Sequence, residues 1–148
     1  MPVPEKIQHD VLVDAPVERV WALITEAEHV GTWFSEAGAE IDLRSGGAMR
    51  LTWEEHGSVE ARVERVEPER LFAFRWPLFG ETLAEGNSTL VEFSLAPEGD
   101  ATRVKVVESG FAELAVSEDQ QRRHAEENTE GWKGELGHLV EHAARVRA

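Results

Sequence analysis

The sequence predicts an α+β fold in which a curved antiparallel sheet wraps one long carboxy-terminal helix. Two observations lead to this prediction. Apolar and polar side chains alternate in successive short stretches, as they do in half-buried strands, and the period becomes helical near the end of the chain. No internal repeat or break in composition interrupts the 148 residues, so we expect one domain over residues 1–148.

The amino-terminal part of the chain predicts a strand followed by two short helices. Residues 7–13 place apolar side chains at alternate positions, which indicates a strand with one buried face. The Asp-Ala-Pro of residues 14–16 is typical of a helix start. Apolar side chains then recur at helical spacing over residues 17–24, so we expect Trp21 to belong to the core. A second helical segment is expected over residues 26–34.

A long β region follows, with six further stretches of alternating apolar residues. Glycine-containing turns separate them at roughly ten-residue spacing, which predicts an antiparallel meander. The alternate positions are Ile41 and Leu43; Met49, Leu51 and Trp53; Val59, Ala61 and Val63; Phe72, Phe74 and Trp76; Val91, Phe93 and Leu95; and Val104 and Val106.

The last part of the chain predicts one amphipathic helix. Residues 117–120, Ser-Glu-Asp-Gln, fit a capping box, and a stripe of mostly apolar residues runs from Gln121 to Val146 at helical spacing. Gly131, Gly134 and Gly137 lie inside this helix, and such glycines often mark a kink or a close approach.

The composition excludes several kinds of site and partner. The chain has five Trp and six Phe but no Tyr and no Cys, which excludes disulfides, thiolate nucleophiles and cysteine-based metal sites. Its 29 acidic and 15 basic residues give a net charge of −14, and the basic residues are scattered. A nucleic-acid partner is therefore not expected, and no motif indicates a cofactor.

Neither a secretory signal nor a membrane span is expected. The first six residues contain no basic run that leads into an apolar stretch. Apolar runs such as residues 20–24 are far shorter than the roughly 20 residues that a membrane span needs. We therefore expect a cytoplasmic protein with no membrane partner.

Four stretches of the chain resemble the START-like, or SRPBCC, superfamily. Within it, they resemble the branch of homologues of the activator of the 90-kDa heat-shock protein ATPase. The resemblance spans nearly the whole chain and implies the helix-grip fold, with one strand, two helices, six strands and a long helix in order. The stretches are DAPVERVW (14–21), PERLFAFRW (68–76), TLVEFSLAPEG (89–99) running on to VESGF (107–111), and NTEGW (128–132) with Leu136 and Leu139.

The resemblance implies a cavity between the sheet and the long helix, which different members fill with different ligands or chemistries. The leading prediction is binding of a small hydrophobic or aromatic ligand. An enzyme of the polyketide cyclase/dehydratase type and a co-chaperone-like interaction module are the alternatives. A chaperone partner is not expected, because the eukaryotic co-chaperone looks like a two-domain protein and this chain has no room for the additional domain. Homodimerisation stays open.

Aromatic residues on predicted inner faces are the candidates for the ligand site. They are either plain core or the walls of an apolar pocket of several hundred cubic ångströms, and an indole N–H could bond one polar atom of a ligand. The candidate ligand-binding residues are Trp33, Trp53, Phe72, Phe74, Trp76, Glu108 and Trp132.

Glu108 shares an alternate face with Val104 and Val106, and a carboxylate on such a face must be paired or hydrogen-bonded. It is either a structural group or a polar anchor or general base in the cavity. His9 lies on the apolar face of the first strand, which in this fold runs beside the last strand. His9 and Glu108 are therefore the candidate catalytic pair.

Residues 138–142 match the H-x-x-E-H string of inverted zinc peptidases. With Trp132, Leu136 and Leu139 on the buried stripe, His138 points away from the sheet and His142 lies at the margin. We therefore expect both to face solvent, and no metal site is expected.

Overall fold

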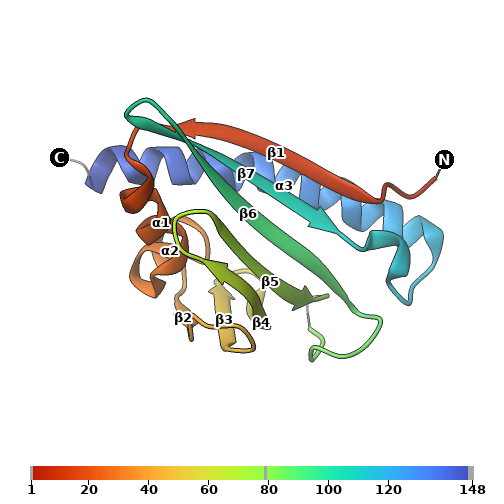
Figure 1. The fold of residues 1–148 in the computed structure, drawn as a ribbon. Coiled ribbons are helices and arrows are strands. Elements are labelled where there is room, and N and C mark those ends of the chain that lie inside the picture. Colours follow the sequence, from red (N-terminus) through yellow and green to blue (C-terminus); the bar gives the residue numbers. More distant parts are fainter. Residues whose placement is uncertain (1, 79, 147–148) are drawn as a thin grey trace.

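The computed structural model describes residues 2–78 and 80–146. In this part of the chain, a seven-stranded antiparallel sheet with the strand order β1-β7-β6-β5-β4-β3-β2 packs with three α-helices. Figure 1 shows α3 crossing behind the sheet, with α1 and α2 near the carboxy-terminal end of α3. The elements are β1 (Lys6–Val13), α1 (Val17–Thr25), α2 (Ala27–Trp33), β2 (Ala39–Ile41), β3 (Ala48–Trp53), β4 (Gly57–Glu67), β5 (Leu71–Pro77), β6 (Ser88–Glu98), β7 (Ala101–Ser109), the 3-10 helix η1 (Phe111–Glu113) and α3 (Glu118–Val146).

This architecture confirms the predicted fold class and helix-grip element order. The strands from β2 to β7 form a meander. β1 pairs with β7, with Val11 opposite Val104, and forms the edge of the sheet opposite β2. The period-two pattern of β7 is retained, since Thr102, Val104, Val106 and Glu108 are all buried. The buried face of β7 therefore carries the carboxylate of Glu108.

The predicted capping box starts α3. The Ser117 Oγ accepts a hydrogen bond of 3.2 Å from the Gln120 backbone N–H, and the Gln120 Oε1 accepts one of 3.4 Å from the Ser117 N–H. These reciprocal bonds satisfy two of the amides that every helix start leaves free. The helix is then continuous from Glu118 to Val146.

The three helix glycines do not mark close approaches. A Cβ built on Gly131, Gly134 or Gly137 would meet no atom within 4 Å, apart from the neighbouring backbone of the helix itself. The close approach that such glycines often mark is therefore absent at these positions, which face away from the buried stripe. Trp21 is half-buried and packs against the core. Among the described residues, none of the helices combines the length and the hydropathy that crossing a membrane requires.

Candidate functional site

An open pocket of about 480 Å³ lies where the ends of β3 and β5 meet the amino-terminal half of α3. Four aromatic residues form its wall, and acidic residues and two histidines surround them. The aromatic residues are Phe34, Trp53, Trp76 and Trp132, and the ionisable ones are Glu36, Glu55, His56, His124, Glu127 and Glu135.

The aromatic wall is a packed cluster rather than a set of isolated rings. The rings of Trp76 and Trp132 stack with centroids 5.5 Å apart and planes 23° from parallel. Phe34 stacks on Trp132 at 5.4 Å and meets Trp53 edge to face at 5.2 Å. These separations and orientations are the favourable ones for aromatic pairs, so the four rings hold one another in place and leave part of their surface to the pocket.

Glu108 lies directly behind this wall, and its side chain has no solvent exposure. Its Oε1 accepts a hydrogen bond of 2.8 Å from Trp132 Nε1, and its Oε2 accepts bonds of 2.9 Å from Trp76 Nε1 and 2.5 Å from Thr89 Oγ1. Asn128 Nδ2 lies 3.0 Å from both oxygens. A buried carboxylate is tolerated only when donors replace its water, and here four side chains do so.

The indole N–H groups of the candidate tryptophans all have acceptors inside the protein. Trp76 and Trp132 donate to Glu108, Trp53 Nε1 donates to the Phe34 carbonyl at 2.9 Å, and Trp33 Nε1 donates to the Leu23 carbonyl at 2.7 Å. An indole has only one N–H donor. The pocket therefore offers a ligand the ring surfaces rather than the N–H groups.

The other predicted ligand-binding residues lie in different places. Trp33 is 4% exposed, contacts the Phe34 ring at a tilt of 31° and lies outside the pocket lining. Phe72 and Phe74 are each 1% exposed and belong to the core. Sequence reasoning missed Phe34 and Asn128 as site residues, although Asn128 stands on the predicted buried stripe one helical turn before Trp132.

His9 and Glu108 are diagonal neighbours on the sheet. His9 stands opposite Val106, and Glu108 stands opposite Ile7. Diagonal residues on one face are typically about 7–8 Å apart. The four side chains that bond the Glu108 carboxylate come from β5, β6 and α3, and His9 is not among them. The register therefore places the two residues on one face without joining them.

The surroundings of Glu135, which lines the pocket, shift the pKa of its carboxyl group. Burial raises the pKa of Glu135 to about 7, the nearby His138 opposes this rise, and the negative charge of Glu36 adds to it. Its Oε1 lies 2.9 Å from His138 Nδ1. Its Oε2 is buried and has no hydrogen-bond partner among the described residues. One oxygen of this pocket-lining residue is therefore buried without a hydrogen-bond partner in the described part of the chain.

The H-x-x-E-H string is split between two environments. His138 is exposed, as expected, but the expectation for His142 is wrong, because it is only 6% exposed. Its Nε2 lies 2.9 Å from Nδ1 of His29 in α2, so the packing of α2 covers it. Burial lowers the pKa of His142, and His29 and Arg145 add to the effect. No group of three or more metal-ligating side chains occurs in the described part of the chain.

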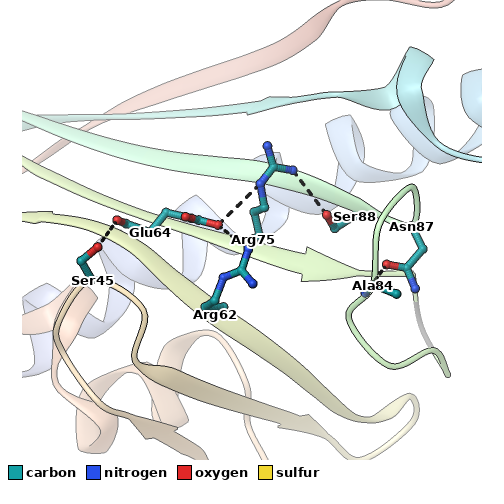
Figure 2. A network of polar contacts seen from close by, with 7 residues as sticks. All are labelled: Ser45, Arg62, Glu64, Arg75, Ala84, Asn87 and Ser88. Atoms are coloured by element: carbon teal, nitrogen blue, oxygen red, sulfur yellow. Dashed lines mark hydrogen bonds and ion pairs between the residues drawn. The ribbon is translucent and has the colours of Figure 1, made fainter.

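A second polar network lies on the outer face of the sheet (Figure 2), and none of its residues lines the pocket. Arg62 and Arg75 stand opposite each other on β4 and β5, and Arg62 alternates with the buried Val63. Both guanidinium groups approach Oε1 of Glu64, at 3.0 and 3.6 Å, and Arg75 also donates to Ser88 Oγ at 3.3 Å. The two positive charges thus share a carboxylate on the surface, where such pairs contribute little.

Comparison with known proteins gives one family and several structures. The sequence profile of the family described as "Activator of Hsp90 ATPase homolog 1-like protein" matches residues 14–144. No curated protein sequence matches the chain significantly.

Three solved structures illustrate the likeness in fold. Protein MLL2253 from Mesorhizobium loti superposes with a TM-score of 0.79 at 20% identity, over 95% of this chain and 97% of that one. DynU16, from the dynemicin biosynthetic locus, gives 0.76 at 23% identity, over 93% of this chain and 46% of that one. CalU16 from Micromonospora echinospora gives 0.71 at 25% identity, over 93% and 75% of the two chains.

Proposed function

Because the chain belongs to the family of Activator of Hsp90 ATPase homolog 1-like proteins, we propose that it binds a small hydrophobic or aromatic molecule in the pocket between the sheet and α3. The observation that carries the proposal is the wall of four aromatic rings around an open space of about 480 Å³. Small-molecule sites are typically concave, largely apolar and about 300–1,000 Å³ in volume. A molecule with one or two rings fits this space.

Ring surface that stays exposed in the aromatic wall supports ligand binding. Trp53 and Trp76 are half-buried, so each keeps ring surface that a ligand could cover. Burial of apolar surface contributes roughly 25 cal/mol per Å². The fixed stacking of Trp76 and Trp132 means that little side-chain freedom is lost when a ligand binds.

The arrangement around Glu108 supports a structural role for this carboxylate. Both oxygens already accept hydrogen bonds from protein donors, so proton abstraction by Glu108 would first have to break them. Glu108 is also absent from the described residues that line the pocket. Glu108 thus serves the proposed site by orienting two rings of its wall.

The pocket can be tested with two matched glycine variants on α3. Gly131 lines the pocket and Gly134 does not, while both have open space around them. We expect Gly131→Leu to fill the pocket and weaken binding of the neutral probes 4-phenylbutanol and 2-naphthylethanol by about tenfold or more, since each buried methylene contributes about 0.8 kcal/mol. Gly134→Leu should bind them as the wild type does.

Isothermal titration calorimetry gives the affinities, and circular dichroism confirms that both variants fold. Native mass spectrometry of freshly purified protein identifies any co-purifying compound. Binding of neither probe by the wild type, or equal binding by both variants, would contradict the proposed pocket.

A second candidate function is acid–base catalysis on the bound molecule, and one observation favours it. Glu135 lines the pocket and has a pKa raised to about 7, near the pH at which a general acid or base works best. The test incubates a co-purifying compound with the wild type and with Glu135→Gln. Conversion by the wild type alone would support catalysis, and recovery of the unchanged compound from both would support binding alone.

A further inference from the structure

The aromatic wall of the pocket is backed by the buried carboxyl group of Glu108. Trp76 and Trp132 donate their N–H groups to the Glu108 carboxylate at 2.9 and 2.8 Å. An indole ring carries its positive potential at the N–H edge and its negative potential on the two faces. Hydrogen bonding of that edge to a carboxylate polarises the ring further toward its faces. The surfaces that line the pocket therefore attract positive charge.

The charged side chains around the aromatic wall also favour a positively charged ligand. Four glutamates line the pocket, and no lysine or arginine is among the lining residues. The basic groups of the lining are the two imidazoles of His56 and His124. Field lines from charges of one sign concentrate in a concave site, so the pocket favours a cation over a neutral or anionic molecule of the same shape.

Glu135 supplies a specific acceptor for such a cation. Its Oε1 is bonded to His138, whereas its Oε2 is buried without a hydrogen-bond partner among the described residues. An unsatisfied buried acceptor is unfavourable by about 1–3 kcal/mol. A turn of the carboxyl group toward the pocket would let an N–H group of a ligand bond this oxygen, and a charged N–H donor bonds a carboxylate about twice as strongly as a neutral one.

We propose that the ligand is a hydrophobic or aromatic amine in its protonated form, with its apolar part against Trp53, Trp76 and Trp132 and its ammonium group at Glu135. This inference rests on the proposed function and adds the charge of the ligand. The wall would hold the apolar part of the molecule and Glu135 its ammonium group, and the negative potential of the nearby ring faces would add to the attraction of the cation.

The binding of an ammonium group should release protons near neutral pH. Burial raises the pKa of Glu135 to about 7, so part of the population is protonated there, and an adjacent cation favours the charged form. The other charged or titratable groups facing Glu135 are His138 and Glu36. Other titratable residues also line the pocket, namely Glu55, His56, His124 and Glu127. The number of protons released by Glu135 is therefore taken as the difference in proton release between the wild type and Glu135→Gln.

The experiment compares three probes of matched shape by isothermal titration calorimetry at about pH 7. They are 4-phenylbutylamine, 4-phenylbutanol and 4-phenylbutyrate, which carry a positive, a neutral and a negative end. We expect the amine to bind about tenfold tighter than the alcohol and the carboxylate to bind most weakly. Titration in phosphate and in Tris buffer should give different enthalpies for the amine, because protons are released.

Two variants with the same change in net charge separate the local effect from the overall one. Glu135→Gln should reduce the preference for the amine over the alcohol by about tenfold and abolish its share of the proton release. Glu130→Gln, an exposed position of the same helix outside the lining, should change the preference less than about twofold.

The outcomes distinguish this inference from the proposed function. If the alcohol binds and the amine binds no tighter, the charge preference is wrong and the hydrophobic pocket stands. If Glu130→Gln reduces the preference as much as Glu135→Gln does, the preference comes from net charge and the assignment to Glu135 is wrong. If 4-phenylbutanol does not bind, the proposed function fails and this inference, which rests on it, fails with it.

Discussion

Trp132 Nε1 donates a hydrogen bond of 2.8 Å to Oε1 of Glu108, a side chain without solvent exposure. This contact joins the wall of the pocket, on α3, to the only carboxylate on the inner face of β7. The same carboxylate also holds Trp76 on β5. The orientation of two pocket rings therefore depends on one buried charge, and the stability of the fold and the shape of the site are coupled there.

Replacement of Glu108 should destabilise the protein strongly. In Glu108→Gln an amide nitrogen takes the place of one oxygen and meets the N–H of Trp76 or Trp132, donor against donor. Buried donors left without acceptors are unfavourable by about 1–3 kcal/mol each, so we expect the free energy of unfolding to fall by about 2–4 kcal/mol. Urea denaturation measures it, with the exposed Glu130→Gln as control. A loss below about 0.5 kcal/mol would mean that the donors do not depend on this carboxylate.

The pH dependence of stability should depend on His142. Burial lowers its pKa from the ordinary value of 6.5, so below that pH the unfolded chain binds a proton that the folded protein does not. The contribution of His142 to stability therefore decreases as the pH falls from about 7 to about 5. In His142→Gln this part of the decrease should vanish. Denaturation at both pH values checks it, with the exposed His56→Gln as control, and identical pH profiles for the wild type and His142→Gln would contradict it.

Glu135 should contribute to stability with the opposite dependence on pH. Because its folded pKa is raised to about 7 from 4.5, the folded protein binds more protons than the unfolded chain between these values. The contribution of Glu135 to stability is therefore present at low pH and is lost as the pH rises toward 7. Glu135→Gln should gain stability relative to the wild type on going from about pH 5 to about pH 8, as measured by urea denaturation. An equal difference at both pH values would show that Glu135 is not desolvated.

The sheet and the long helix were predictable because their signals are local. Alternation along residues 102–108 places Glu108 inward, and the capping box at Ser117 places the start of α3. That β1 pairs with β7 was expected from the family resemblance, whereas the register, with Val11 opposite Val104, comes from the structure. Period and capping involve residues within a few positions of one another, so a sequence carries them directly.

The assembly of the site was not predictable in the same way. Glu108 meets Trp76 and Trp132 across 32 and 24 residues of chain, and no periodicity encodes that three elements converge there. His142 illustrates the same limit, since its helical phase indicates the margin of α3 but His29 of α2 covers it. Which ring edges point at Glu108 depends on tertiary packing.

Ligand binding in the pocket can be followed in a two-dimensional ¹⁵N–¹H spectrum of the five indole N–H groups during titration with 4-phenylbutanol. We expect the signals of Trp53, Trp76 and Trp132 to shift with one common dissociation constant, because all three line the pocket. The signal of Trp21, which lies on α1 outside the pocket lining, should stay in place. Saturable shifts at the three pocket tryptophans would support ligand binding in this pocket. An unchanged spectrum or an equal shift of Trp21 would contradict it.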